Sequence, residues 1–470
     1  MRKYILLSTA VILAGLLILG IFVTPADKNQ EGMNTDAKIA PKQTRSPYIT
    51  EYTLPTPESG PMAITVDHNG EVWIAATNIT KLVRFNPVSK GFREFKIPKL
   101  NFTSIWGMVV DNHGSIWFTS TNDNSIWSFN PTENGFKQYP VPTKDAFPLR
   151  IAVDGEGQMW FTELYAGKLG RIEPSTGEIV EYKIPRNRSG GPTGLSVDAE
   201  GNIWFADAYA NMIGKFDPRT YAFTEYPSAA SIFSPTGIGV DSRGRVWFLE
   251  HGGSLFGEFS QSDNSTVKYA TSITGRFSTT LPYWLSIDKS GNIWFNEHSG
   301  NRIARFDPSN EVLVEYELPK GQIGVEGIVN ALHFTIAPDG NVWFSEWTEN
   351  KIGIINVSKP IPFQMNVDDR RVTATPGSDV KVGLSLSGTA DRHIVIQTSG
   401  TFSFTGKLLN ATTQFSPQQV LLMKNSSYKS DLTIKLGKSL VPGEYVLTIG
   451  ASDGDVNYSV MVHVDVKGKI

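Results

Sequence analysis

The stretch GNIWFNEHSGNRIARFDP, residues 291–308, decides the fold because its pattern returns along most of the chain. Its first four residues end a repeated eight-residue motif, IDKSGNIW, residues 287–294. The motif consists of an apolar residue, Asp, any two residues, Gly, any one residue, a second apolar residue and Trp. Earlier copies are VDHNGEVW (66–73), VDNHGSIW (110–117), VDGEGQMW (153–160), VDAEGNIW (197–204) and VDSRGRVW (240–247), and a variant, IAPDGNVW (336–343), follows. Successive Trp residues are 43 to 49 positions apart, a period that suits the four-stranded blade of a β-propeller.

Each repeat supplies four strands, A to D. Strand A is the apolar run before the Asp, and the Asp–x–x–Gly turn reverses the chain because Gly tolerates the positive φ of a tight hairpin. Strand B carries the Trp, strand C reads NRIARFDP (301–308) and strand D reads LVEYELP (313–319) in the same repeat. No part of this region has a sustained 3.6-residue periodicity, which excludes a helical solenoid.

The strand count predicts how the ring closes. Seven A–B–C sets are followed by only six D strands, because the seventh set ends at KIGIINVS, residues 351–358. A spare D-like segment, ITEYTLP (49–55), precedes the first set. We expect it to complete the last blade, which removes the exposed sheet edges that would otherwise favour aggregation. The prediction is a seven-bladed β-propeller over residues 48–358.

The repeat Trp and Asp residues have structural roles in this interpretation. One large aromatic residue on an inner strand of each blade is the expected filler between neighbouring blades. The Asp side chains are expected to accept hydrogen bonds from turn amides.

The first 47 residues predict a membrane anchor and a spacer. Arg2 and Lys3 precede an uncharged apolar run from Tyr4 to Val23, long enough to cross a bilayer as a helix. We expect residues 1–23 to be a retained signal anchor, with a cleaved signal peptide as the alternative, and residues 24–47 to be a flexible linker. The basic residues stay on the cytoplasmic side, so the rest of the chain is extracytoplasmic on the membrane, or secreted if the signal is cleaved.

Composition agrees with an exported all-β protein. The chain has no Cys and a net charge of −3, which excludes disulfides and thiolate chemistry and leaves no basic footprint for nucleic acid. Glycosylation sequons support export and predict a glycoprotein. They lie at Asn78, Asn101, Asn187, Asn264, Asn356, Asn410, Asn425 and Asn457.

The pattern changes after Pro360. Residues 362–468 contain short alternating strands separated by turn residues, among them EYVLTIGA (444–451) and YSVMVHVDV (458–466). About 100 residues of this kind predict an immunoglobulin-like β-sandwich, which could bind a surface-protein partner.

Topology sorts the polar residues of the propeller between its two rims. The D–A and B–C connections share one rim, which should carry His251, His298 and His333, while His68 and His113 lie in A–B turns on the other. Five carboxylates lie where strand B ends on the first rim: Glu163, Asp207, Glu250, Glu297 and Glu346. They could hold a hard divalent cation such as Mg²⁺ or Ca²⁺; the favoured alternative is that each accepts amide hydrogen bonds within its own loop.

Aromatic residues join this rim and favour a polar, glycan or peptide-like ligand. The predicted ligand-binding set is Arg150, Tyr165, Tyr209, His251, Tyr283, Trp284, His298 and Trp347, with Trp106 nearby. The sequence contains no nucleophile elbow, phosphate loop or dinucleotide fingerprint.

The repeats resemble those of the streptogramin (virginiamycin B) lyases. The resemblance rests on GNIWFNEHSGNRIARFDP and on GQMWFTELYAGKLGRIEP (157–174) followed by EYKIP (181–185), and it extends from about Ile49 to Val357. It implies a Mg²⁺-dependent carbon–oxygen lyase that opens an ester of a cyclic depsipeptide with a His base at the channel mouth. His333 lies where the family has its catalytic His, and Glu346 lies near a family carboxylate.

Three positions depart from the family pattern. Ala331, Tyr283 and Met62 stand where the family has Glu, His and Tyr. Three functions therefore stay open: a surface binding propeller for a small ligand with or without a divalent cation, a metal-dependent lyase with His333 as base, and a purely structural surface module.

Overall fold

The computed structural model describes residues 46–98, 100, 103–185, 191–226, 232–272, 279–323, 327–403 and 411–468. It is an all-β protein, as predicted, and its short 3₁₀ segments include η1 (Thr77–Ile79) and η2 (His251–Gly253). No helix within the described ranges is long and apolar enough to span a bilayer. The predicted anchor, residues 1–23, lies outside the described residues.

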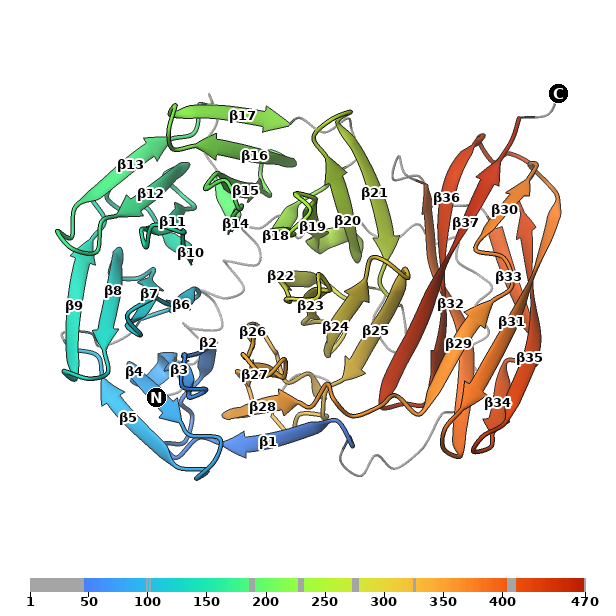
Figure 1. The fold of residues 1–470 in the computed structure, drawn as a ribbon, viewed down its shortest axis with the longest axis horizontal. Coiled ribbons are helices and arrows are strands. Elements are labelled where there is room, and N and C mark those ends of the chain that lie inside the picture. Colours follow the sequence, from blue (N-terminus) through green and yellow to red (C-terminus); the bar gives the residue numbers. More distant parts are fainter. Residues whose placement is uncertain are drawn as a thin grey trace.

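Repeated four-stranded antiparallel sheets stand around a common axis, as in a β-propeller (Figure 1). In chain order they are β2 (Pro61–Val66), β3 (Val72–Ala76), β4 (Lys81–Phe85) and β5 (Phe92–Lys96); β6 (Met108–Val110), β7 (Ile116–Ser120), β8 (Ser125–Asn130) and β9 (Gly135–Pro140); β10 (Pro148–Val153), β11 (Met159–Glu163), β12 (Lys168–Ile172) and β13 (Ile179–Lys183); β14 (Pro192–Val197), β15 (Ile203–Asp207), β16 (Met212–Asp217) and β17 (Ala222–Tyr226); β18 (Pro235–Val240), β19 (Val246–Glu250), β20 (Leu255–Ser260) and β21 (Ser265–Ala270); and β22 (Pro282–Ile287), β23 (Ile293–Glu297), β24 (Arg302–Asp307) and β25 (Val312–Glu317). The first strand of each set is the innermost (Figure 1).

The chain closes its ring with its first described strand. β1 (Ile49–Thr53) pairs antiparallel with β28 (Lys351–Ile355), giving the sheet order β1-β28-β27-β26 with β27 (Val342–Glu346) and β26 (Phe334–Ile336). The spare segment found in the sequence therefore supplies the missing outer strand.

Each repeat Trp is buried, and six of the seven are held by the repeat Asp. In the β10–β13 sheet, Trp160 donates its indole N–H to Asp154 at 2.8 Å, and the other Asp154 oxygen accepts the amides of Glu156 and Gln158. The same bond joins five further pairs at 2.8–3.2 Å: Asp67–Trp73, Asp111–Trp117, Asp198–Trp204, Asp241–Trp247 and Asp288–Trp294. The structural interpretation of both residues is thus supported, and the Asp also fixes the orientation of the Trp ring.

Replacing Asp154 by Ala is expected to lower the free energy of unfolding by about 2 kcal/mol, because the buried indole N–H and two turn amides lose their acceptor. Asp339→Ala is the matched control: Asp339 occupies the variant turn, and its one hydrogen-bond partner among the described residues is Asn341. Urea denaturation followed by Trp fluorescence measures both. Equal losses in the two variants would contradict the anchoring role.

The C-terminal region adds two packed sheets. One has the order β29-β31-β35-β33, and the other is a path of strands that begins in the propeller: β22-β23-β24-β25-β37-β36-β32-β34, with β30 beside β37. The strands are β29 (Phe363–Val367), β30 (Arg371–Ala374), β31 (Asp379–Gly388), β32 (Arg392–Ser403), β33 (Ala411–Ser416), β34 (Gln419–Leu422), β35 (Ser427–Leu436), β36 (Gly443–Ser452) and β37 (Val456–Val466).

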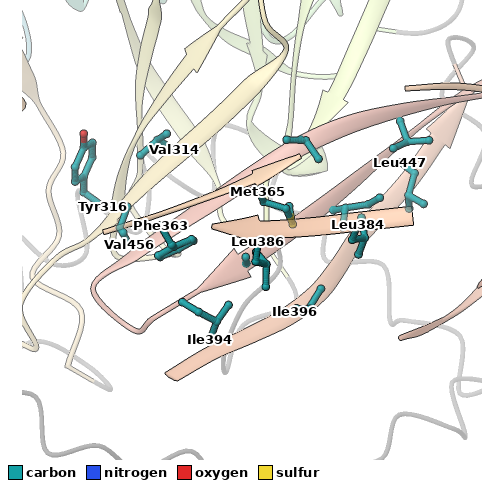
Figure 2. Close-up of a cluster of buried hydrophobic side chains, with 14 of the residues drawn as sticks. Val314, Tyr316, Phe363, Met365, Leu384, Leu386, Ile394, Ile396, Leu447 and Val456 are labelled. Carbon is teal, nitrogen blue, oxygen red and sulfur yellow. The ribbon is translucent and has the colours of Figure 1, made fainter. Parts of the chain in front are cut away.

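The two parts of the chain share one continuous sheet. β25, the outer strand of its propeller sheet, pairs antiparallel with β37 from Val312↔Val460 to Tyr316↔Val456. Val314 and Tyr316 meet Phe363, Met365 and Val456 in one apolar cluster at this junction (Figure 2). The C-terminal region is therefore docked along the propeller, and the linear domain division predicted from sequence misses this pairing.

Polar contacts reinforce the junction. His463 on β37 lies between two carboxylates, 2.9 Å from Glu311 and 3.0 Å from Glu444. Asn457 donates to Glu317 at 2.9 Å and is 1% exposed, so the predicted sequon at Asn457 is inaccessible in the fold. The sequons at Asn78, Asn264, Asn356 and Asn425 are exposed, and those at Asn101, Asn187 and Asn410 lie outside the described residues.

Candidate functional site

Side-chain hydrogen bonds join neighbouring sheets around the axis. Each runs from a side chain on an inner strand to a carbonyl at the start of the next sheet: Thr119 to Leu149, Thr193 to Pro235, Thr236 to Pro282, Asn296 to Ala331 and Ser345 to Met62. These bonds fix the inner ends of the sheets relative to one another. Side chains that project from those ends are therefore held on a rigid frame.

Six predicted rim residues meet on this frame, and we call them the axial cluster: Arg150, His251, Tyr283, Trp284, His298 and His333. They come from β10, from β22, from the connections after β19 and β23, and from the residue before β26. All except Trp284 are at most 8% exposed. The sequence prediction that D–A and B–C connections gather these side chains agrees with this arrangement.

Arg150 crosses the axis from β10 to β22. Its Nε donates to the carbonyl of Thr193 at 3.0 Å and its Nη2 to the carbonyl of Tyr283 at 3.2 Å. The guanidinium carbon lies 3.7 Å from the ring centre of Trp284 and 4.7 Å from that of Tyr283, within the range of cation–π attraction. Burial lowers the pKa of Arg150 to about 10, so the side chain is still a cation at neutral pH.

The histidines of the cluster are neutral at pH 7. Burial lowers the pKa of His251 to about 4 and that of His298 to about 3, and their rings stack with centroids 5.1 Å apart. His251 donates Nδ1–H to the carbonyl of Pro282 at 3.1 Å. Its Nε2 is then an acceptor, and no donor among the described residues reaches it.

His333, the predicted catalytic base, is buried against an aromatic ring. It is 4% exposed, and its ring centroid lies 3.6 Å from that of Trp284. Burial, followed by the nearby Arg150 cation, lowers its pKa well below the usual range. Neither ring nitrogen has a hydrogen-bond partner within the described ranges, so no described carboxylate orients this imidazole.

Three further aromatic residues of the predicted ligand-binding set lie in connections that follow second strands. Tyr165 and Tyr209, in the connections after β11 and β15, are 41% and 39% exposed. Burial, then the charges of Tyr165, Asp207 and Tyr283, raises the pKa of Tyr209 to about 12. Trp347 is half-buried, and its indole N–H meets no acceptor in the described part of the chain.

The five predicted metal-binding carboxylates are each at most 2% exposed. Glu250 pairs with Lys268 at 2.5 Å and accepts the amide of Phe233. Asp207 accepts the amide of Ala210 at 2.8 Å. Asp207 thus fits the alternative stated from sequence, an amide hydrogen bond within its own loop, whereas Glu250 is held by a lysine and by an amide of another connection.

Glu163 and Glu346 each share a sheet with one salt-bridged carboxylate. Lys168 pairs with Glu181 at 2.7 Å and Lys351 pairs with Glu51 at 2.8 Å, so each cation is already used by the outer-strand Glu. Burial, then the negative charge of Glu181, raises the pKa of Glu163 to about 8. Burial, then Glu51, raises that of Glu346 to about 9. Both inner carboxyl groups therefore carry a proton at neutral pH.

The double variant Glu163→Gln, Glu346→Gln is expected to resist alkaline conditions better than the wild type. Between the unfolded value near 4.5 and the folded values of about 8 and 9, the folded state binds more protons, so the free energy of unfolding falls as pH rises. Gln mimics the protonated form, and we expect a gain on the order of 2 kcal/mol at pH 9 and little at pH 5. Thermal melts at both values, with exposed Glu133→Gln as control, measure this difference; a pH-independent effect would contradict it.

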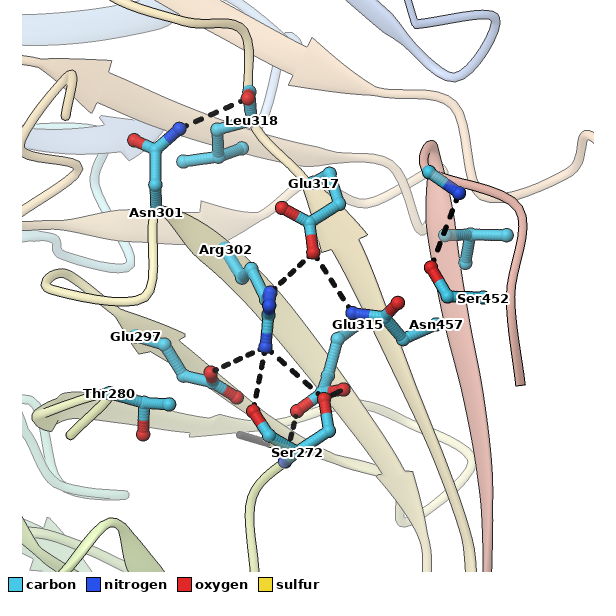
Figure 3. A network of polar contacts seen from close by, with 12 residues as sticks. Ser272, Thr280, Glu297, Asn301, Arg302, Glu315, Glu317, Leu318, Ser452 and Asn457 are labelled. Atoms are coloured by element: carbon cyan, nitrogen blue, oxygen red, sulfur yellow. Dashed lines mark hydrogen bonds and ion pairs between the residues drawn. The ribbon is translucent and has the colours of Figure 1, made fainter. Parts of the chain in front are cut away.

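Glu297 belongs to a larger buried network (Figure 3). Arg302 lies 3.8 Å from Glu297 and 2.5 Å from Glu317, and it donates to the carbonyl of Ser272 at 2.8 Å. Glu315 accepts the amide of Ser272 at 2.8 Å. The single guanidinium thus pairs with Glu297 on β23 and Glu317 on β25, and Ser272 links it to Glu315, also on β25.

The residues present do not fit a divalent cation. Ca²⁺ or Mg²⁺ needs several ionised oxygen ligands that converge on one point, whereas each of the five predicted carboxylates lies on a different sheet. No group of three or more His, Asp or Glu side chains in the described ranges is placed to hold a metal. Ala331, where the resemblance expects Glu, offers no ligand side chain.

The four-stranded sheets form a ring, and a buried cation and aromatic rings lie together at the ends of the inner strands. The protein is therefore a β-propeller with a candidate site on its axis. The family model for the virginiamycin B lyase family matches residues 20–276, and the chain belongs to this family.

Solved structures agree with this assignment. A streptogramin B lyase structure is 28% identical, with a TM-score of 0.58, covering 66% of this chain and 97% of that one. Virginiamycin B lyase from Staphylococcus aureus is 26% identical, with a TM-score of 0.57 and coverage of 66% and 99%. A catalytically inactive variant of that enzyme, solved with quinupristin, gives 26% identity, a TM-score of 0.57 and coverage of 65% and 98%. A search of curated proteins found no match.

Sequence reasoning missed the partners that surround the site. It did not foresee the carbonyls that hold Arg150, or the outer-strand residues Glu181, Glu51 and Glu317. The signal for the second group was present, since a Lys or Arg opens strand C and a Glu lies on strand D in several repeats. Pairing them required the strand register.

Proposed function

We propose that this chain is a membrane-anchored, extracytoplasmic binding protein: a seven-bladed propeller followed by an immunoglobulin-like sandwich. Its ligand is a small polar, glycan or peptide-like molecule held at the rim of the D–A and B–C connections. The observation that carries the proposal is the axial cluster, in which buried polar atoms of His251 and His333 lack partners among the described residues beside exposed Tyr165 and Tyr209. Buried polar groups are normally satisfied, so such orphans favour a missing ligand.

Binding is favoured over lyase chemistry by the state of His333. A general base needs a group that orients it and access to the proton it removes. His333 packs on Trp284, has no described hydrogen-bond partner and is 4% exposed. Its position in the family pattern favours the lyase as the second candidate, with an ester or lactone as substrate.

A thermal-shift screen of the full-length chain with glycans, short peptides and small polar molecules tests the binding function. A ligand that binds only the folded state at 100 times its Kd stabilises it by about 2.7 kcal/mol. We expect the shift to vanish in the double variant Tyr165→Ser, Tyr209→Ser. It should persist in the matched control Tyr221→Ser, since Tyr221 lies after β16 and its side chain is 64% exposed. Ligands that stabilise the double variant as strongly as the wild type would place binding elsewhere.

Metal removal is expected to leave the melting temperature and ligand binding unchanged, because no group of three or more His, Asp or Glu side chains among the described residues is placed to hold a metal. The measurement compares chelator-treated protein with protein in millimolar Mg²⁺ or Ca²⁺. Under the lyase alternative, cyclic depsipeptides or lactones would be opened only with metal, and the turnover would disappear in His333→Ala.

A further inference from the structure

We propose that the axial cluster recognises a carboxylate group on a planar or aromatic small molecule, with the Arg150 guanidinium as its counter-charge. This inference rests on the proposed function and names the ligand class for the same site. It departs from the metal-assisted chemistry that the family resemblance implies, because the positive charge belongs to the chain itself.

Arg150 carries a buried positive charge that no described carboxylate balances. The side chain is 5% exposed, and no carboxylate of the described residues lies within ion-pair distance of it, in contrast to buried Arg302 and Lys268. A buried charge without a counter-ion is costly. A ligand anion would remove that cost, so the site gains free energy selectively from an acceptor with negative charge.

The Arg150 guanidinium is held in place before any ligand binds. Two carbonyls and two aromatic rings fix it, while Nη1 donates to no described residue. Such pre-organisation lowers the cost of ordering on binding. Arg forms strong charge-assisted bonds with carboxylates in this fixed geometry.

The histidines of the axial cluster do not change the single positive charge of Arg150. His251, His298 and His333 are neutral at pH 7 because burial lowers their pKa values. The cluster thus carries one positive charge, which matches a monoanion; phosphate sites usually combine several donors or cations.

The side chains around Arg150 favour a ligand with a planar or aromatic body. Aromatic rings lie around the cation: Trp284 and Tyr283 lie against it, and Trp106 is 6.3 Å from Tyr283. Rings of this kind pack well on planar or aromatic groups. The ligand class that follows is an aryl or similarly planar carboxylate.

The test is calorimetric titration of the full-length chain at pH 7 with phenylacetate and indole-3-acetate, each against its neutral amide. We expect each carboxylate to bind about tenfold or more tightly than its amide. Arg150→Gln, which retains an amide donor for the carbonyls, should abolish this preference, and Arg150→Lys should retain part of it. Arg93→Gln, an exposed cation on β5, and added chelator should change neither.

Several results would overturn the inference. They are equal binding of acid and amide, a preference that survives Arg150→Gln, a preference that needs a metal ion, and no binding of either carboxylate at about 10 mM. Circular dichroism and melting of both Arg150 variants show whether they fold. Neutral ligands that depend on Tyr165 and Tyr209 but ignore Arg150→Gln would end the carboxylate assignment while leaving the rim site in place.

Discussion

Replacing β1 (Ile49–Thr53) by a Gly-Ser stretch of equal length is expected to destabilise the protein by on the order of 5 kcal/mol. The change removes the five pairings from Ile49↔Ile355 to Thr53↔Lys351 that close the ring. It also removes Tyr52, whose ring lies 4.7 Å from Phe85 and 6.0 Å from Trp343. The open β28 edge would then be free to pair with other chains.

Chemical denaturation and size-exclusion chromatography measure this effect. The same replacement at residues 31–35, within the predicted linker, is the control and should change neither stability nor oligomeric state. A β1 variant that melts like the wild type would show that ring closure contributes little to the folded state.

Arg302→Met is the second change with a large expected effect, a loss of about 3–5 kcal/mol. Burial alone would lower the pKa of Arg302, but Glu317, Glu315 and Glu297 raise it, which shows how strongly the carboxylates depend on this cation. Met fills a similar volume and leaves those carboxylates facing one another in a buried network (Figure 3).

Arg305→Met is the matched control on the same strand. Arg305 lies 5.8 Å from the ring centre of Trp294 and makes no ion pair among the described residues, so its loss should cost less than about 1 kcal/mol. Urea melts at pH 7 and pH 5 compare the two. If the Arg302 defect is no larger than that of Arg305, or does not shrink at pH 5 as carboxylates take up protons, the network account fails.

The repeat was sufficient to predict the propeller sheets. Trp294 and its counterparts recur with a fixed turn and a following strand, so local hairpin rules carry most of the architecture. Even the long-range pairing of β1 with β28 could be predicted, because a strand count leaves one unpaired segment at each end.

The pairing of β25 with β37 could not be predicted in this way. Edge strands recognise one another through backbone groups, and neither Val312–Glu317 nor Val456–Val466 carries a residue pattern that names its partner. The same reason hides the buried carboxyl pairs, since Glu163 and Glu181 come together only through the register of three strands.

The rim position of the site residues could be predicted from the sequence, but their contacts across the ring could not, for a related reason. Topology could place His251, Tyr283 and His333 on one rim, but it could not show that Arg150 reaches across the ring to the carbonyl of Tyr283. The protonation of Glu163 and Glu346 also depends on burial, which the sequence does not report. The same holds for the ion pairs that Glu250 and Glu297 make with Lys268 and Arg302 of their own sheets, which only the strand register brings together.

A crystal structure of the protein with phenylacetate tests the central claim most directly. The account predicts the ligand carboxylate within hydrogen-bonding distance of Arg150 and its ring against Tyr283 or Trp284, with no ion between them. Ligand bound away from the axial cluster, or a metal ion held by Glu163, Glu297 or Glu346 at the rim, would contradict it.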